Sequence, residues 1–179
     1  MDPGSRTVLV VDDEANVVRA LERTLRREGY TILSASEPAE ALAILRETAV
    51  EVVLSDQLMP NMSGLDFLKT VRALHPDVVR IMLTGHAEVA TAVEAINEGE
   101  IYRFLTKPWD DAELKVALHL AFDRIGLERS NRRLLAALEH QRRLLARLER
   151  AHPGLRHLLR DESGALLIDG DDQASVAVG

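Results

Sequence analysis

The 179-residue sequence has no cysteine, no apolar run long enough to cross a membrane and no excess of basic residues. The missing cysteines exclude disulfides, zinc–thiolate sites and thiol catalysis. The formal net charge of −7 argues against general binding to the phosphate backbone of nucleic acids. Residues 1–6 lack the apolar segment of a signal peptide. These absences predict a cytoplasmic protein that does not contact membranes.

Short apolar runs alternate with helical patterns through about residue 122. Five runs rich in β-branched residues fit buried strands, at 7–11, 30–35, 51–55, 78–83 and 101–105. The segments between them carry apolar residues at helical spacing, with helix-start signals such as Ser63 and Asp110. This alternation predicts an α/β domain, a parallel sheet with helices on both faces and right-handed crossovers.

The last helical segment is far longer than the others, since no proline interrupts it between Asp110 and Glu149. Its second apolar stripe advances in alternating steps of four and three residues, which is a heptad seam. The seam consists of Leu127, Asn131, Leu134, Leu138, Gln141, Leu145 and Leu148. Asn131 at a core position favours a parallel homodimer; other oligomers, or a helix that folds back, are the alternatives. Glutamates alternate with the flanking arginines, so a solvated coil is favoured over a nucleic-acid surface.

We therefore expect an N-terminal tail at 1–6, a domain at 7–124, a coiled-coil extension of the last helix at 125–151 and a C-terminal segment at 152–179. That last segment is small and acidic toward its end, and we expect it to be partly disordered or the start of a truncated output region.

Polar residues end four of the five predicted strands. They are Asp12 and Asp13 after the first, Asp56 at the third, Thr84 at the fourth and Lys107 at the fifth. The carboxyl ends of parallel strands meet at one edge of the sheet, where ligands bind. Three clustered carboxylates repel one another and recruit a hard cation such as Mg²⁺, which typically bridges to a phosphate. Lys107 and Thr84 can contact phosphoryl oxygens.

This arrangement resembles the receiver domains of two-component response regulators over residues 7 to about 122. Four motifs carry the resemblance: Val10-Val11-Asp12-Asp13-Glu14, residues 55–64 around Asp56, Leu83-Thr84-Gly85-His86-Ala87, and Lys107-Pro108-Trp109. The resemblance implies the flavodoxin-like, doubly wound fold with strand order 2-1-3-4-5. It also implies that the Lys107–Pro108 peptide is cis.

The resemblance also implies a role for each residue at this edge. Asp56 is the phosphoacceptor, and a histidine kinase or phosphotransfer protein is the donor. Asp13, Asp56 and the backbone carbonyl of Leu58 bind Mg²⁺ directly, whereas Asp12 does so largely through water. Thr84 and Lys107 contact the phosphoryl group.

Two aromatic residues and two tuning positions complete the resemblance. Phe104 matches the switch aromatic of the family, and alternation along the strand predicts that Tyr102 shares its face. Leu58 and His86 lie at the positions that tune phosphoryl lifetime. Leu58 cannot orient an attacking water, whereas a histidine such as His86 can, and we expect an aspartyl phosphate that is long-lived compared with that of fast-cycling chemotaxis regulators.

Residues 100–111, together with Ser55-Asp56-Gln57, resemble receivers of HD-GYP cyclic-di-GMP phosphodiesterases and of hydrogenase-type transcriptional activators. Neither output is visible in the sequence: it has no HD-GYP signature, no glycine-rich nucleotide loop and no helix-turn-helix after residue 150. Two functions follow. The chain is a non-enzymatic response regulator that acts through phosphorylation-gated protein contact and a coiled-coil dimer, or it is a receiver fragment of a larger regulator with a phosphodiesterase or DNA-binding output.

A haloacid-dehalogenase-like phosphatase also uses a strand-end aspartate and Mg²⁺. Its Asp-x-Asp motif follows the first strand, whereas Asp56 ends the third strand and Leu58 stands in place of the second acid. The phosphatase interpretation is therefore not favoured.

Overall fold

The computed structural model describes residues 6–151 as an α/β domain whose last helix is strongly extended. Its five strands form one parallel sheet in the order β2-β1-β3-β4-β5. The strands are β1 Arg6–Val11, β2 Tyr30–Ala35, β3 Val52–Asp56, β4 Val79–Thr84 and β5 Arg103–Thr106. The predicted fold class and strand order are thus confirmed, and every strand lies within two residues of its predicted position.

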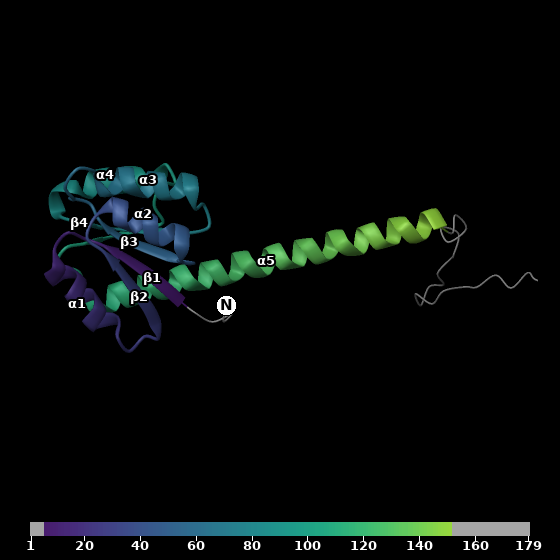
Figure 1. Ribbon diagram of the computed structural model, residues 1–179, viewed down its shortest axis with the longest axis horizontal. Coiled ribbons are helices and arrows are strands. Elements are labelled where there is room, and N and C mark those ends of the chain that lie inside the picture. Colours follow the sequence, from purple (N-terminus) through teal and green to yellow (C-terminus); the bar gives the residue numbers. More distant parts are fainter. Residues whose placement is uncertain (1–5, 152–179) are drawn as a thin grey trace, which may run out of the picture. The chain divides into compact units, whose positions relative to one another are not determined.

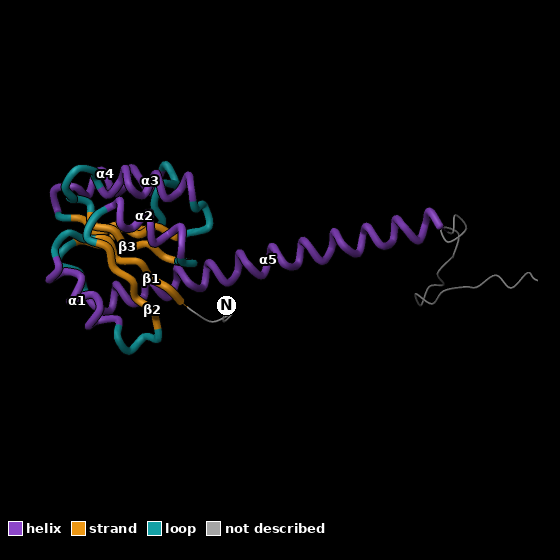
Figure 2. Tube along the Cα trace, in the orientation of Figure 1, coloured by secondary structure: helices purple, strands orange, loops and turns teal. Residues whose placement is uncertain are grey.

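The helices cover both faces of this sheet (Figure 1). They are α1 Ala15–Leu25, α2 Pro38–Glu47, α3 Gly64–Leu74, α4 Val89–Asn97 and α5 Asp111–Ala151, with a short 3-10 turn, η1, at His86–Glu88. Figure 2 shows α2, α3 and α4 on one face of the strands, and α1 with the beginning of α5 on the other. This is the doubly wound arrangement expected from strict strand–helix alternation.

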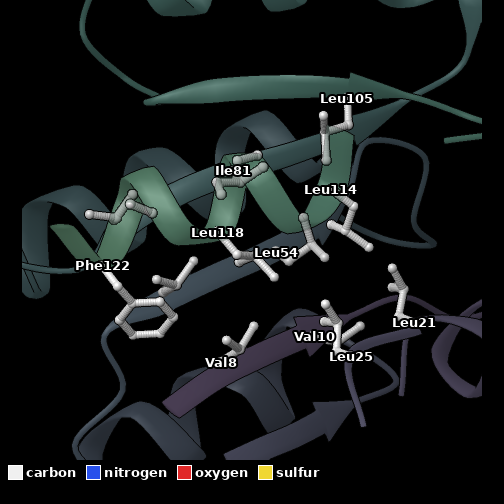
Figure 3. Packing of buried hydrophobic residues seen from close by; sticks show 14 of the residues in the cluster. Val8, Val10, Leu21, Leu25, Leu54, Ile81, Leu105, Leu114, Leu118 and Phe122 are labelled. Atoms are coloured by element: carbon white, nitrogen blue, oxygen red, sulfur yellow. The ribbon is translucent and has the colours of Figure 1, made fainter. Parts of the chain in front are cut away.

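Alternate residues of the central strands feed two separate cores, as period-two geometry requires. The core under α1 and α5 contains Val8, Val10, Leu54, Ile81 and Leu83 from the strands. Leu114, Leu118 and Phe122 of α5 close this core (Figure 3). Strands β1 and β3 are buried on both faces and therefore need a continuous apolar sequence. This is why the sequence alone predicts them.

Side-chain caps fix two helix starts that matter for the carboxyl edge of the sheet. The Ser63 hydroxyl accepts a hydrogen bond from the Asp66 N–H at 3.1 Å, immediately before α3. Asp110 Oδ1 accepts from the N–H groups of Ala112 and Glu113 at 2.8 and 2.9 Å, immediately before α5. Both capping residues were recognisable in the sequence because each satisfies amides that the first helical turn leaves unpaired.

Helix α5 belongs to two compact units, with the boundary between Arg129 and Ser130. In the first unit its apolar stripe is buried; from Leu127 onward its leucines are exposed. The N-terminal tail up to residue 5 and the segment 152–179 lie outside the described residues. Within 6–151, no helix combines the length and apolar character needed to cross a membrane.

Candidate functional site

The strand register brings the predicted polar residues together at the carboxyl edge of the sheet. Asp56 is the last residue of β3 and pairs in register with Leu83 of β4. Thr84 is the last residue of β4, and Lys107 directly follows β5. The Lys107 N–H donates to the Thr84 carbonyl at 2.7 Å, which continues the β4–β5 ladder past the strand end.

Three carboxylates form one acidic cluster at this edge. The nearest oxygens of Asp12, Asp13 and Asp56 all lie within 4.8 Å of one another. Asp12 and Asp56 are buried, whereas Asp13 is exposed and leaves the cluster open to solvent. Hard oxygen ligands at this spacing suit Mg²⁺, which accepts a few carboxylates and keeps several waters. The residues at the site therefore fit the metal that the family resemblance implies.

Lys107 bridges the two buried carboxylates. Its Nζ lies 2.8 Å from Asp12 Oδ2 and 2.6 Å from Asp56 Oδ1. The sequence predicts that this lysine contacts a phosphoryl group; the structure adds that its ammonium pairs with the acids themselves. Such a pair compensates charges whose burial would otherwise be very costly.

The protonation equilibria follow from these contacts. Burial raises the pKa of Asp12 above its ordinary value, and the hydrogen bonds from Lys107 and from the Glu14 N–H offset that only in part. Burial lowers the pKa of Lys107, but its bonds to Asp12 and Asp56 outweigh this and leave the pKa raised. The lysine is therefore firmly cationic, and the acidic pocket is one in which negative charge is expensive without a cation.

Replacing Lys107 with methionine is expected to make folding depend on Mg²⁺. Without the metal the free energy of unfolding should fall by roughly 2 kcal/mol, because buried carboxylates lose their only neighbouring cation among the described contacts. Mg²⁺ should bind roughly tenfold or more tightly once the competing ammonium is gone. Urea unfolding followed by the fluorescence of Trp109, the single tryptophan, measures both effects.

Lys115→Met is the matched control, since this more exposed lysine of α5 forms a 2.9 Å surface pair with Glu28. Its loss should change the free energy of unfolding by less than about 1 kcal/mol. Equal Mg²⁺ stabilisation of wild type, Lys107→Met and Lys115→Met would contradict the competition between Lys107 and the metal.

The β3–α3 loop holds Asp56 through contacts that the sequence did not predict. Asp56 Oδ2 accepts a hydrogen bond from the Leu58 N–H at 3.0 Å. The Gln57 N–H donates to Leu83 at 2.9 Å, and Gln57 Oε1 accepts from the Leu65 N–H at 3.1 Å. Gln57 therefore ties the loop to both β4 and α3. A glutamine directly after Asp56 carries no spacing signal, so only the structure reveals this role.

Gly64 is the second residue whose structural role the sequence does not predict. A Cβ at this position would overlap the Asp56 carbonyl oxygen. It would also lie 2.8 Å from the Asp56 carbonyl carbon and from the Gln57 Cα. Only glycine lets the start of α3 approach the phosphoacceptor candidate this closely.

Thr84, Leu58 and His86 differ in their exposure to solvent. Thr84 is fully buried at the end of β4, and its hydroxyl donates to the Gly85 carbonyl at 3.3 Å. Leu58 is 64% exposed, and His86 is exposed at the start of η1. The Lys107–Pro108 peptide is cis, as the resemblance implied.

The two aromatics of the β5 region lie in different cores, so the expectation that Tyr102 shares the face of Phe104 is wrong. Phe104 packs against the core under α2, α3 and α4, whereas Tyr102 packs against the core under α1 and α5. Strand β5 begins at Arg103, and alternation does not extend to a residue before the strand. Tyr102 instead lies under the Arg124 guanidinium of α5, whose carbon is 5.2 Å from the ring centroid.

The far end of β3 carries a further contact that no motif predicted. Glu51, immediately before the strand, accepts from the Thr7 N–H at 2.9 Å and from Arg129 of α5 at 3.2 Å. The stretch of α5 from Arg124 to Arg129 is thus attached to the sheet by one cation–π contact and one ion pair. The seven predicted seam residues lie along α5, and all are exposed.

The family model described as the response regulator receiver domain matches residues 8–119. Among curated proteins, the hydrogenase transcriptional regulatory protein HoxA of Cupriavidus necator is 39% identical over 134 residues, covering 75% of this chain and 28% of its own length. The transcriptional regulatory protein ZraR of Salmonella typhimurium is 32% identical over 174 residues, covering 94% of this chain and 38% of its own length. The chain thus spans well under half of these relatives.

Solved structures show the same similarity. The signal receiver domain of an HD domain-containing protein from Pseudomonas fluorescens is 36% identical, with a TM-score of 0.65, covering 69% of this chain and 98% of that one. A structure titled adenylate cyclase from Rhodopirellula baltica is 31% identical, with a TM-score of 0.70, covering 74% and 98%.

Proposed function

The chain belongs to the response regulator receiver domain family, and on that premise we propose that Asp56 accepts a phosphoryl group from a histidine kinase or phosphotransfer protein. The observation that carries the proposal is the cluster of three carboxylates within 4.8 Å, bridged by Lys107 through Asp12 and Asp56. Asp56 is the member that combines a position at the end of a strand with a direct contact to Lys107.

The chemistry is an exchange of one bond for another at phosphorus. A carboxylate oxygen of Asp56 attacks the phosphorus, an O–P bond forms, and the N–P bond to the donor histidine breaks, leaving the electron pair on its imidazole nitrogen. Asp12, Asp13, Asp56 and the Leu58 carbonyl would hold Mg²⁺, which supplies charge neutralisation for the transferring oxygens. Lys107 then exchanges its contact with the Asp56 carboxylate for one with a phosphoryl oxygen.

The signal would travel from the carboxyl edge to α5. Movement of Thr84 and Lys107 toward the phosphoryl oxygens opens space into which Phe104 can turn, and β5 and its flanking helices repack. The contact of Arg124 with Tyr102 supports this route, because it links the residue just before β5 directly to α5.

We further propose that α5 mediates homodimerisation through its seam and that phosphorylation alters this dimer. The support is a row of exposed leucines at heptad spacing on a helix that continues from the receiver. Light scattering and coil cross-linking should differ with and without beryllofluoride. Equal dimer affinity together with unchanged cross-linking would contradict the coupling.

Phosphoryl uptake from acetyl phosphate tests the proposed function directly. Intact-mass spectrometry is expected to show the gain of one phosphoryl group in the presence of Mg²⁺, mapped to Asp56 by peptide analysis, and no gain after chelation. If acetyl phosphate, phosphoramidate and a phosphorylated histidine kinase all fail to modify the chain in Mg²⁺, the assignment of Asp56 is wrong.

The aspartyl phosphate is expected to persist for minutes or longer. The 64% exposed Leu58 side chain offers no hydrogen bond to orient an attacking water. Leu58→Asn should shorten the half-life several-fold, and Leu74→Asn, a change at another exposed leucine, should not. Denaturing quench at timed intervals after donor removal, followed by mass analysis, measures the decay. A wild-type half-life of seconds contradicts the role assigned to Leu58.

A second candidate is that this receiver is the input part of a longer transcriptional regulator. It is favoured by HoxA and ZraR, which are transcriptional regulatory proteins of which the chain spans 28% and 38%. Sequencing the reading frame beyond codon 179 tests this. An in-frame DNA-binding output supports this candidate, and a stop codon supports the receiver with its own coil.

A further inference from the structure

The α5 seam contains two polar residues that any paired coil must accommodate. Spacing along the helix assigns Asn131, Leu138 and Leu145 to heptad position a, and Leu127, Leu134, Gln141 and Leu148 to position d. Asn131 and Gln141 are therefore at different heptad positions. A side-chain amide buried opposite a leucine loses its hydrogen bonds, so the preferred pairing is one that sets the amides against each other.

An antiparallel pair satisfies this condition in one register. Position a faces position d of the second copy when the helices run in opposite directions. Suppose that Asn131 faces Gln141 of the second copy. The other layers of the core then pair leucine with leucine, Leu134 with Leu138 and Leu127 with Leu145. The two-fold symmetry of the pair makes each of these layers occur twice. Sliding by one heptad either way sets Asn131 against Leu134 or Leu148. The seam is thus self-complementary from Leu127 to Leu145 in this antiparallel register, and Leu148 lies opposite Arg124 of the second copy.

A parallel pair also sets the side-chain amides against each other, because Asn131 faces Asn131 and Gln141 faces Gln141 of the second copy. In this orientation Leu148 also forms a core layer with its own copy. The core layers alone therefore do not decide the orientation. The flanking positions e and g do, because they face different partners in the two orientations.

In the antiparallel register the flanks are complementary. Position e faces position e of the second copy, which brings Glu128 opposite Arg142 twice. The same geometry sets Leu135 against Leu135, and at position g it sets Ala137 against Ala137 and Ser130 against Leu144. Leu135 is 55% exposed on α5 and lies outside the seam. The antiparallel pair covers it with its own copy.

In the parallel register the flanks are mismatched. Position g faces position e of the following heptad in the second copy. Leu135 then faces Ser130, Arg142 faces Ala137, and Glu128 faces Asp123, another acid. None of these three contacts pairs opposite charges, and none covers Leu135 with an apolar partner.

We propose that α5 pairs with α5 of a second copy in the antiparallel orientation, with Asn131 opposite Gln141 and Glu128 opposite Arg142. This rests on the coil dimer of the proposed function and gives it a direction. Asn131 by itself is compatible with a parallel pair, whereas the charges and apolar residues at positions e and g favour the antiparallel one.

Spin labelling tests the orientation, since the chain has no cysteine of its own. Arg147→Cys places one label on the exposed side of α5 in each copy. In the antiparallel pair the two labels are about 33 Å apart along the coil axis, at roughly 1.5 Å per residue. In a parallel pair they lie at the same height, within about 20 Å across two helix diameters. Pulsed electron paramagnetic resonance on the full chain distinguishes these distances.

The outcomes separate the two proposals. A long distance in a protein that light scattering shows to be dimeric supports the antiparallel pair. A short distance in a dimeric protein overturns the orientation and leaves the coil dimer standing. A monomeric chain at all concentrations overturns the coil dimer itself, and the orientation with it.

Charge reversal provides an independent test on the dissociation constant. Glu128→Arg or Arg142→Glu should each weaken the dimer roughly fivefold to tenfold, because each replaces two attractions by two repulsions. The double variant should regain wild-type affinity. Arg143→Glu is the matched control: it makes the same change next to Arg142, at a position pointing away from the seam, and should leave the constant unchanged. In the parallel pair, Glu128→Arg would replace a repulsion with Asp123 by an attraction and would strengthen the dimer. Stronger dimerisation of Glu128→Arg would therefore overturn the proposal.

Discussion

Asp56→Asn is expected to abolish phosphoryl uptake and any effect of beryllofluoride on dimer mass. An amide nitrogen and its carbonyl oxygen lack the charge with which a carboxylate oxygen attacks phosphorus. The substitution also removes one of the three carboxylates that approach within 4.8 Å of one another, so Mg²⁺ binding should weaken at the same time. Intact-mass spectrometry after acetyl phosphate treatment measures the loss of phosphoryl uptake. Light scattering with beryllofluoride, on the same preparation, measures the loss of its effect on dimer mass.

Folding of the Asp56→Asn variant should be nearly unaffected. The amide has the shape of the carboxylate, its oxygen can still accept from the Leu58 N–H, and Lys107 keeps its 2.8 Å contact with Asp12. Asp123→Asn, at an exposed acid of α5, is the control and should retain full uptake. Normal phosphoryl uptake by Asp56→Asn on any residue would show that the acceptor is elsewhere.

Gly64→Ala is expected to have the largest effect on folding, with a loss of about 3 kcal/mol or more in the free energy of unfolding. The added methyl group would overlap the Asp56 carbonyl oxygen and lie 2.8 Å from the Asp56 carbonyl carbon and the Gln57 Cα. All three are backbone atoms, so no side-chain rotation relieves the overlap. The β3–α3 loop must move instead, and it carries the Leu58 N–H that holds Asp56.

The Gly64→Ala variant should therefore also phosphorylate poorly in the fraction that folds. Gly126→Ala is the matched control, because a Cβ there meets nothing within 4 Å and the residue lies inside α5. It should stabilise the protein by about 1 kcal/mol through helix propensity. Urea unfolding of both variants decides the matter: wild-type stability in Gly64→Ala would mean that the loop yields easily and that the close approach has no consequence.

The fold could be predicted from the sequence because the patterns that indicate its strands and helix starts are local. Strand β3 is a short β-branched run that ends in Asp56, and Ser63 and Asp110 announce helix starts by their own side-chain chemistry. Parallel pairing then places Asp12, Asp56 and Lys107 at one edge without further information. These features need only periodicity and the rule that parallel strands share an edge.

The contacts that the sequence did not predict join residues that are close in space but not in the chain, or depend on the path of a loop. The contact of Glu51 with Arg129 joins residues far apart in the chain, and neither belongs to a motif. The close approach of Gly64 to Asp56 depends on the path of a loop, which composition does not specify. Tyr102 was misplaced because β5 begins two residues later than predicted, and the alternation of side chains between the two faces holds only within a strand.

Strand β3 has an acid at each end, and the two acids contact cations that differ in their access to water. Lys107 is 20% exposed where it meets Asp56, whereas Arg129 is 52% exposed where it meets Glu51. Dissolved salt screens exposed charges far more than buried ones. Ionic strength therefore acts selectively: moderate salt should loosen the anchorage of α5 at Arg129 while leaving the contact of Lys107 with Asp56 intact. Salt concentration thus separates the two ends of one strand, so that the proposed phosphoryl transfer to Asp56 and its proposed transmission to α5 can be tested independently in the same unmodified molecule.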